Sequence, residues 1–259
     1  MGLYSYLLFS CSKTIFGYFE INMTRPSKDI ALVLPVFNEE LLIDSCLQKW
    51  INTFTDLGLD FEILVVDDGS WDKTPVVLSS YIPDSRIQII TKHNEGHGPS
   101  ILRGYRDAVE IATWVFQADS DSEISPDEFS ALWDLRLNND AVIGWRVKRE
   151  QSFIRKAVSR VAALSTRLFF SSTLKDPNIP FRLIRSDTLE RIISRIPRNT
   201  FAPNLIISGA LKRLKLSVVQ YPVQYHERTI GETSLSNLKA VKKGSQAFVQ
   251  TAKISRMFS

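Results

Sequence analysis

Short apolar segments alternate with helical segments from residue 29 onward, and this alternation is the strongest constraint on the fold. Segments rich in β-branched, aliphatic and aromatic residues predict strands at 30–34, 61–66, 86–90 and 113–116. The stretches between them predict helices at 39–54, 72–80 and 98–111. Strands that alternate with helices form a mostly parallel sheet covered on both faces. We therefore expect an α/β fold with ligands at the carboxyl ends of its strands.

The composition fits one large globular domain. The chain has 259 residues, of which 44% are apolar and 23% charged. Its two cysteines form no C-x-x-C pair, which favours a reducing compartment and argues against zinc. We expect an apolar N-terminal extension over 1–28, the main domain over 29–238 and a basic helix or tail over 239–259. No apolar run reaches 18 residues, so the sequence predicts no transmembrane helix.

Charge is divided unevenly along the chain. Residues 1–143 hold 10 Lys and Arg against 22 Asp and Glu, a net charge of −12. Residues 144–259 hold 22 against 6, a net charge of +16. An acidic part can hold a metal, while a basic part can receive phosphates, nucleic acid or an anionic membrane. Nucleic acid is the weaker interpretation because none of its usual fold signatures is present. Residues 153–170 predict an amphipathic basic helix, which suits either a membrane interface or packing with a solvated face.

Three carboxylates follow the fourth predicted strand. Asp119, Asp121 and Glu123 are spaced two residues apart, and on an extended chain such residues point to the same side. Oxygen ligands of this kind suit Mg²⁺ or Mn²⁺ shared with a substrate diphosphate. A solvated acidic turn is the simpler alternative, but polar residues at the other strand ends favour a metal site.

Polar residues also follow the first two predicted strands. Asn38 and Glu39 stand at a strand-to-helix junction, which can hold a ribose or base, although helix capping by Asn38 explains them too. Asp67 and Asp68 end the second strand. Their carboxylates can accept hydrogen bonds from a base, and an Asx turn is the alternative. Recurrence at neighbouring strand ends favours a binding role.

A glycine-rich turn follows the third predicted strand. Gly96 permits close approach of the backbone to a ligand, and the helix that begins near Gly98 favours an anionic phosphate at its start. His97 fits either a diphosphate contact or a surface turn.

Taken in order, these motifs resemble the family 2 glycosyltransferases with the GT-A fold, most closely the dolichyl-phosphate mannose synthase-like, polyprenyl-phosphate branch. The resemblance covers about residues 29–238 and rests on P-V-F-N-E-E, V-V-D-D-G-S-W-D-K-T, N-E-G-H-G, D-S-D-S-E, G-W-R, D-P-N-I-P-F-R-L-I-R and Y-P-V-Q-Y-H-E-R-T-I-G-E-T-S-L. It implies a Rossmann-like nucleotide-binding half and an acceptor half. Two departures stand out: Thr233-Ser234 leaves no lysine, and Gln220 replaces an acid.

The resemblance also implies roles for single residues. The nucleotide sugar would contact Pro35, Asn38, Glu39, Asp67, Asp68, Gly96, Asp119 and Arg146. The metal, Mg²⁺ or Mn²⁺, would bind Asp119, Asp121 and Glu123, where Glu replaces the usual Gln. Positions that contact the diphosphate and the acceptor phosphate would be Arg146, Arg155 or Arg160, Arg182 and Arg228, and Asp121, Arg182 and Arg228 would act in catalysis. Asp176 is the best remaining candidate for a catalytic carboxylate.

The implied activity is an inverting, metal-dependent transfer of a sugar from a GDP- or UDP-sugar to a polyprenyl phosphate. We expect a cytoplasmic protein with peripheral contact to the cytoplasmic face of a membrane. Many relatives that act on hydroxyl acceptors have a Glu-Asp pair, and this chain has none. Asp176 is left as a base or as the residue that positions Arg182. The alternatives are transfer to a glycan hydroxyl and a non-catalytic sugar-nucleotide-binding protein.

Overall fold

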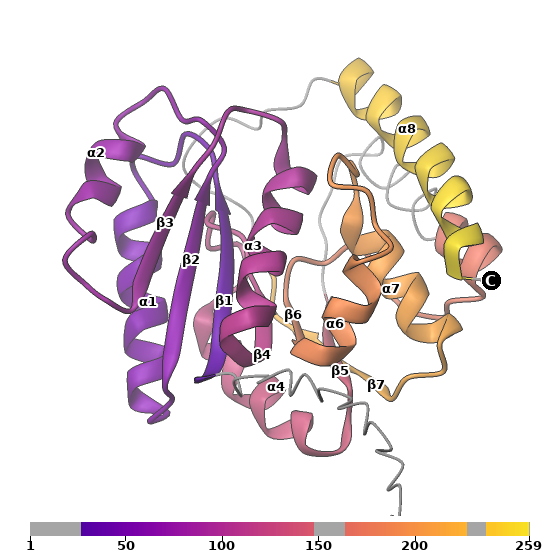
Figure 1. Cartoon of the computed structure of the whole chain (residues 1–259), viewed down its shortest axis with the longest axis horizontal. Helices are drawn as coiled ribbons and strands as arrows, with labels where there is room; N and C mark the ends of the chain where they lie inside the picture. The colour runs from indigo at the N-terminus through magenta and orange to yellow at the C-terminus, as the bar shows by residue number, and fades with distance from the viewer. Residues whose placement is uncertain (1–26, 148–163, 227–236, 259) are drawn as a thin grey trace, which may run out of the picture.

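A seven-stranded sheet forms the centre of the computed structural model, which describes residues 27–147, 164–226 and 237–258 (Figure 1). The strand order is β3-β2-β1-β4-β6-β5-β7. Among the described strands only β6 runs antiparallel to its neighbours. The strands are β1 (Lys28–Val36), β2 (Phe61–Asp67), β3 (Ile87–Thr91), β4 (Ala112–Gln117), β5 (Ala141–Arg146), β6 (Arg182–Arg185) and β7 (Val218–Val223). The predicted α/β fold with a mostly parallel sheet is confirmed.

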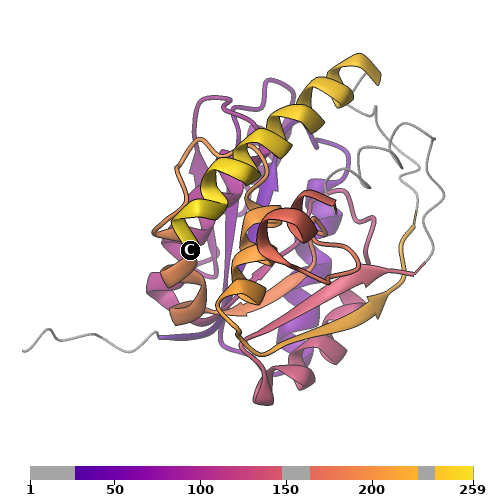
Figure 2. The ribbon, with the colours of Figure 1, turned by 90° about the vertical axis from the view of Figure 1, so that its right-hand side faces the viewer.

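Helices cover both faces of this sheet (Figure 1). They are α1 (Ile43–Asp56), α2 (Thr74–Ser79), α3 (His97–Ile111), α4 (Phe129–Leu135), α6 (Ser186–Ile193), α7 (Pro203–Arg213) and α8 (Asn237–Ser255). Residues 164–170 are also helical, and 3₁₀ turns occupy Pro126–Glu128, Arg136–Asn138 and Arg256–Phe258. Helix α8 packs against α7 at the outside of the molecule (Figure 2).

Aromatic rings fill the space beneath α1 and α4. Trp50 of α1 lies 5.3 Å from the ring of Phe116 on β4 and 6.1 Å from Phe129 of α4. Phe116 and Phe181 meet edge to face at 4.8 Å, an arrangement that aromatic pairs prefer. Successive side chains of a strand point to opposite faces of the sheet. The side chains of β1 and β4 that do not face α1 and α4 therefore face the helices on the other side.

Helix α3 covers that opposite face at close range. A Cβ atom at Gly104 would lie 2.4 Å from Cγ1 of Val33 and 3.1 Å from Cγ2 of Val66. This distance is too short for a methyl group, so the glycine allows α3 to reach the centre of the sheet.

The first predicted helix begins later than expected, at Ile43 rather than Glu39. Asn38 has a positive φ of 54°, and the side chain of the residue before the helix, Leu42, makes no capping bond. Helix capping by Asn38 is therefore wrong. Most of the predicted amphipathic segment 153–170, and the extension 1–26, lie outside the described residues. Within the described part of the chain, no helix is long and apolar enough to span a bilayer.

We expect Gly104→Ala to destabilise the fold by about 1–3 kcal/mol because the new methyl group overpacks Val33. Gly58→Ala is the control: its Cβ would meet nothing within 4 Å although φ is +65°, so strain alone should cost about 1 kcal/mol. Urea denaturation measures both free energies of unfolding. Equal losses in the two variants would contradict close packing at Gly104.

Candidate functional site

The parallel register brings the sequence motifs to one edge of the sheet. Val36 at the end of β1 pairs with Asp67 at the end of β2, and Val33 pairs with Gln117 at the end of β4. Strands β5 and β7 end at the same edge, where the antiparallel β6 begins. All loops that follow these strands therefore lie around one region, as predicted for a parallel sheet.

The loops after β1 and β2 are bonded to each other. The backbone N–H of Asn38 donates to Oγ of Ser70 at 2.9 Å, and that of Glu39 donates to Oγ1 of Thr74 at 2.8 Å. In return, Oδ1 of Asn38 accepts from the backbone N–H of Trp71 at 3.0 Å. Pro35 lies within β1 opposite Val66. The polar residues of the first motif thus hold the second motif in place.

The paired aspartates at the end of β2 have separate roles. Asp67 closes its own turn, because its Oδ1 accepts from both the N–H and the Oγ of Ser70. Asp68 reaches the third loop, where its oxygens accept from the backbone N–H groups of Glu95 and Gly96 at 3.0 and 2.8 Å. Both carboxylates are buried. Through these bonds the two carboxylates hold the loops that follow β2 and β3 in place.

Lys92 also contacts Asp68, and no sequence motif indicates a role for this lysine. Its ammonium group contacts the Asp68 carboxylate and lies 3.0 Å from that of Glu95. It also donates to the His93 carbonyl. A lysine at a strand end is a weak sequence signal, and only the fold shows that it faces Asp68. Gly96 itself has φ of 99°, a conformation that favours glycine.

The acidic segment after β4 turns instead of remaining extended. Ser122 has a positive φ of 57°, and Oδ1 of Asp121 accepts from the N–H of Glu123 at 3.1 Å, as in an Asx turn. The two-residue alternation of a strand therefore ends at Gln117. Asp119, Asp121 and Glu123 do line one small hollow together with Arg146. However, no three His, Cys, Asp or Glu side chains among the described residues form a group that could hold a metal ion. The metal-binding role of Asp119, Asp121 and Glu123 therefore stays a prediction.

Asp119 nevertheless has the character of a ligand. Its Oδ1 is fully buried with no hydrogen-bond partner, and Nε2 of His97 lies 3.5 Å away, beyond a good hydrogen bond. Burial first, and then the nearby Asp121, raise the pKa of Asp119 well above its ordinary value, while Arg146 lowers it. A buried acceptor without a donor is suited to a cation. Mg²⁺ commonly takes one or two carboxylates and completes its shell with substrate phosphates and water, and Asp119 and Asp121 fit that role.

Arg146 and Asp176 stand beside the carboxylate loop. Nη1 of Arg146 lies 3.3 Å from Oδ2 of Asp176, and both side chains are largely buried. The guanidinium also lies 5.4 Å from the centre of the Tyr225 ring, and its Nε is buried without a hydrogen-bond partner. The structure brings Asp176 to Arg146; no ion pair joins Asp176 to Arg182 in the described part.

Arg182 does not reach the open edge of the site. It is fully buried, and its guanidinium donates to the carbonyls of Pro177, Ile179 and Asn204. The expectation that Arg182 contacts a phosphate is therefore corrected: the bonds to backbone carbonyls occupy its donors. The sequence motif F-R-L-I-R does not distinguish a buried arginine from one that binds a ligand. Arg155, Arg160 and Arg228 lie outside the described residues.

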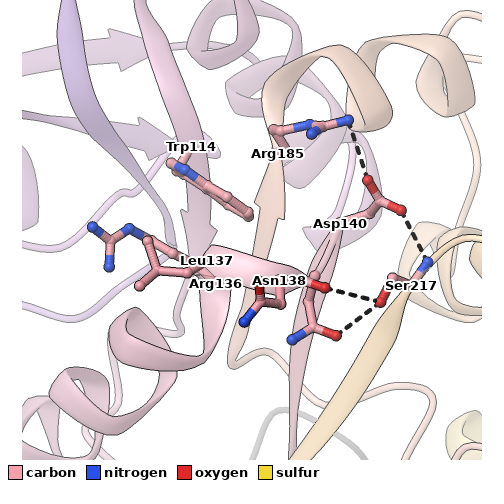
Figure 3. Close-up of a pocket in the computed structure, with 8 residues that line it drawn as sticks. Trp114, Arg136, Leu137, Asn138, Asp140, Arg185 and Ser217 are labelled. Atoms are coloured by element: carbon pink, nitrogen blue, oxygen red, sulfur yellow. Dashed lines mark hydrogen bonds and ion pairs between the residues drawn. The ribbon is translucent and has the colours of Figure 1, made fainter.

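A larger hollow, of about 470 Å³, lies at the opposite edge of the sheet (Figure 3). Its lining includes Trp114, Arg185, Asp140 and Ser217. Arg185 is ion-paired with Asp140 at 3.2 Å, and Asp140 accepts from the N–H of Ser217 at 2.9 Å. Of the sequence motifs, only F-R-L-I-R reaches this edge, through Arg185, and none of the candidate site residues lines the hollow. Its size therefore does not make it the functional site.

Comparison with known proteins gives a consistent assignment of the fold. Residues 31–193 match the family model described as "Glycosyl transferase family 2". An undecaprenyl-phosphate 4-deoxy-4-formamido-L-arabinose transferase of Pectobacterium carotovorum is 26% identical over 218 residues, which cover 83% of this chain and 64% of that protein. The transferase of the same name from Sodalis glossinidius is 27% identical over 225 residues, with coverages of 85% and 67%. The chain thus spans about two thirds of the length of these relatives.

Solved structures support the same architecture. Glucosyl-3-phosphoglycerate synthase from Mycobacterium tuberculosis, in complex with phosphoglyceric acid, superposes with a TM-score of 0.65 at 17% identity. The match covers 88% of this chain and 80% of that one. The same enzyme in complex with Mn²⁺, uridine diphosphate and glucosyl-3-phosphoglycerate also gives a TM-score of 0.65 at 17% identity, with the same coverages. At this identity the likeness concerns the fold.

We expect Asp119→Asn to raise the midpoint of thermal unfolding at neutral pH in metal-free buffer. Folding raises the pKa of Asp119, so the folded state binds its proton more tightly, and ionisation of the carboxyl group opposes folding at neutral pH. The contribution of this carboxyl group to the free energy of unfolding is fully present below its ordinary pKa of 3.8. It is lost as the pH rises through the higher pKa of the folded state.

The gain in Asp119→Asn should therefore shrink as the pH falls toward 3.8. Asp134→Asn, at an exposed position of α4, is the control and should change the midpoint little. Differential scanning calorimetry across this pH range measures the effect. A lower midpoint for Asp119→Asn at neutral pH would contradict it.

Proposed function

The chain belongs to glycosyl transferase family 2, and we propose that it transfers a sugar from a nucleoside diphosphate to a polyprenyl phosphate. The observation that carries the proposal is that Asp119, Asp121 and Arg146 line one hollow at the carboxyl edge of the sheet, with Asp176 3.3 Å from Arg146. The undecaprenyl-phosphate transferases among its relatives support a lipid acceptor.

The nucleotide would lie over the loops that follow β1, β2 and β3. Asn38, Glu39 and the Asp67–Asp68 pair belong to loops that are bonded to one another, so the surface they form is fixed before a ligand arrives. A preformed site binds more tightly because little ordering is left for the ligand to induce. Gly96 adds backbone that a diphosphate can approach closely.

The diphosphate would then meet the carboxylate loop. Asp119 and Asp121 are the residues that would hold Mg²⁺ or Mn²⁺, with Glu123 beside them. A divalent cation there would neutralise the charge that develops on the departing nucleoside diphosphate. Arg146 has a buried Nε without a hydrogen-bond partner at the same hollow, and an arginine suits phosphate oxygens.

In the transfer step, an acceptor oxygen attacks the anomeric carbon as the bond from that carbon to the diphosphate oxygen breaks. The electron pair of that bond leaves with the nucleoside diphosphate, and the anomeric configuration inverts. A phosphate acceptor is already anionic near neutral pH and needs orientation, whereas a hydroxyl acceptor needs a base. Asp176 would serve the first case by holding Arg146 in place.

A hydroxyl acceptor is the second candidate, and the partly exposed Asp176 carboxylate favours it. The side chain of Asp176 is 14% exposed, so one of its oxygens could take a proton. Labelling of a soluble glycan acceptor in the absence of lipid would support this candidate over the first.

The first test is transfer of radiolabel from a panel of GDP- and UDP-sugars into an organic-extractable polyprenyl-phosphate product, with Mg²⁺ or Mn²⁺ added. Asp121→Ala should lower kcat about 100-fold or more, because it removes a carboxylate from the loop that would hold the cation. Donor binding without any labelling by the wild-type protein would contradict the proposal and favour a non-catalytic sugar-nucleotide-binding protein.

A second test concerns Asp176. Asp176→Asn keeps the shape of the side chain but removes the charge that faces Arg146 at 3.3 Å, and misplacement of that arginine should lower kcat on the order of 100-fold. Asp140→Asn is the matched control because it breaks an Asp–Arg pair of similar length, 3.2 Å, at the other edge of the sheet. Near-normal turnover in Asp176→Asn would remove this residue from the mechanism.

A further inference from the structure

The backbone that follows Asp176 is bonded to two buried side chains, of which Arg182 makes the most bonds. Nε and Nη2 of Arg182 donate to the Ile179 carbonyl at 2.9 and 2.6 Å, and Nη2 also donates to the Pro177 carbonyl at 3.1 Å. Nη1 donates to the Asn204 carbonyl in the first turn of α7 at 3.1 Å. One guanidinium therefore joins the 177–179 backbone to α7.

Ser208 of α7 doubles this connection. Its hydroxyl donates to the Pro177 carbonyl at 2.7 Å and accepts from Nη1 of Arg182 at 3.3 Å. Ser208 and Arg182 are both fully buried. Because this buried hydroxyl donates to the carbonyl of the residue next to Asp176, it fixes the distance between that carbonyl and α7. None of the sequence motifs includes Ser208.

A buried cation of this kind is costly. No carboxylate lies within ion-pair distance of Arg182 among the described residues, and the charge is solvated by carbonyl dipoles instead. Burial lowers the pKa of its guanidinium, and Tyr105, Asp176 and Asp119 raise it. A well-packed apolar side chain is often at least as stabilising as a buried charge. Stability alone therefore does not explain an arginine here.

The other side of Asp176 is held as well. Its carboxylate faces Arg146 at 3.3 Å, and the preceding Lys175 places its Nζ 3.8 Å from the centre of the Trp145 ring. The N–H of Lys175 donates to Oε1 of Gln220 on β7 at 2.7 Å. Two consecutive residues of this segment thus contact two consecutive residues at the end of β5.

We infer that Arg182 and Ser208 form a buried brace that sets the position of Asp176 against Arg146, and through it the orientation of Arg146 at the carboxylate loop. Both are positioning residues, since neither reaches the hollow. The catalytic consequence rests on the proposed function. The geometric claim does not, because it concerns only how the 174–181 segment is held.

The geometric claim is tested by hydrogen–deuterium exchange in the full chain. Ser208→Ala should raise the exchange rate of amides in 174–181 about tenfold, because the loss of one buried hydrogen bond makes local opening easier. Ser186→Ala is the matched control: it also removes a buried hydroxyl that donates to a carbonyl, that of Ala112, at the far edge of the sheet. Unchanged exchange in Ser208→Ala, or an equal rise in both variants, would overturn the brace.

A double-mutant cycle tests the catalytic consequence. Ser208→Ala alone should lower kcat about tenfold, but in an Asp176→Asn background it should change kcat less than about twofold because the residue it positions has lost its charge. Independent tenfold losses in both backgrounds would show that Ser208 acts by another route. A general loss of packing would give such additivity, so this result would also overturn the inference.

The two proposals fail separately. A wild-type protein with no transfer to any acceptor would contradict the proposed function, and the exchange experiment would then decide the brace alone. Normal transfer with unchanged exchange in Ser208→Ala would overturn the brace and leave the function standing. If Ser208→Ala does not fold, Ser208→Cys keeps a weak donor of similar size and should give an intermediate rise in exchange; wild-type exchange rates in that variant would overturn the brace.

Discussion

Parallel pairing of β1 with β2 and β4 is the constraint on which the site depends. Because parallel strands all end at the same edge, the registers Val36 with Asp67 and Val33 with Gln117 bring together loops that are distant in sequence. The polar side chains of these loops then bond to neighbouring loops. The Asn38–Trp71 and Asp68–Gly96 bonds are examples. The loops at this edge are thus held in place by bonds within the chain.

Opposite charges from the two halves of the chain meet at this edge. Asp119 and Asp121 come from the acidic part, while Arg146 comes from the basic part. Burial first, and then repulsion by Asp121, raise the pKa of Asp119, while Arg146 and the buried Arg182 offset part of that rise. Oδ1 of Asp119 is also buried without a hydrogen-bond partner. A bound cation would remove that cost, so stability and ligand binding are linked at the same carboxylate.

Much of the fold follows from the sequence because apolar segments of strand and helix length are local signals. The strands and helices around the first four motifs could be predicted from this pattern, within a few residues at their ends. The geometry of the carboxylate loop could not, because it depends on the Asx turn at Asp121 and the positive φ of Ser122. Lys92 was missed for a related reason: its partner, Asp68, lies 24 residues earlier in the chain, in the loop after β2.

Arg182 shows where a motif ceases to be informative. Arginine within a basic, phosphate-associated motif predicts a ligand contact, but the same five donors can equally satisfy backbone carbonyls. Which of the two occurs depends on whether α7 covers the residue, as it does here through Asn204 and Ser208. Contacts of this range, 22 and 26 residues apart in the chain, have no local sequence signature. A buried arginine can therefore be connected to a site that it does not touch: Arg182 bonds to the Pro177 carbonyl, and the preceding Asp176 faces Arg146.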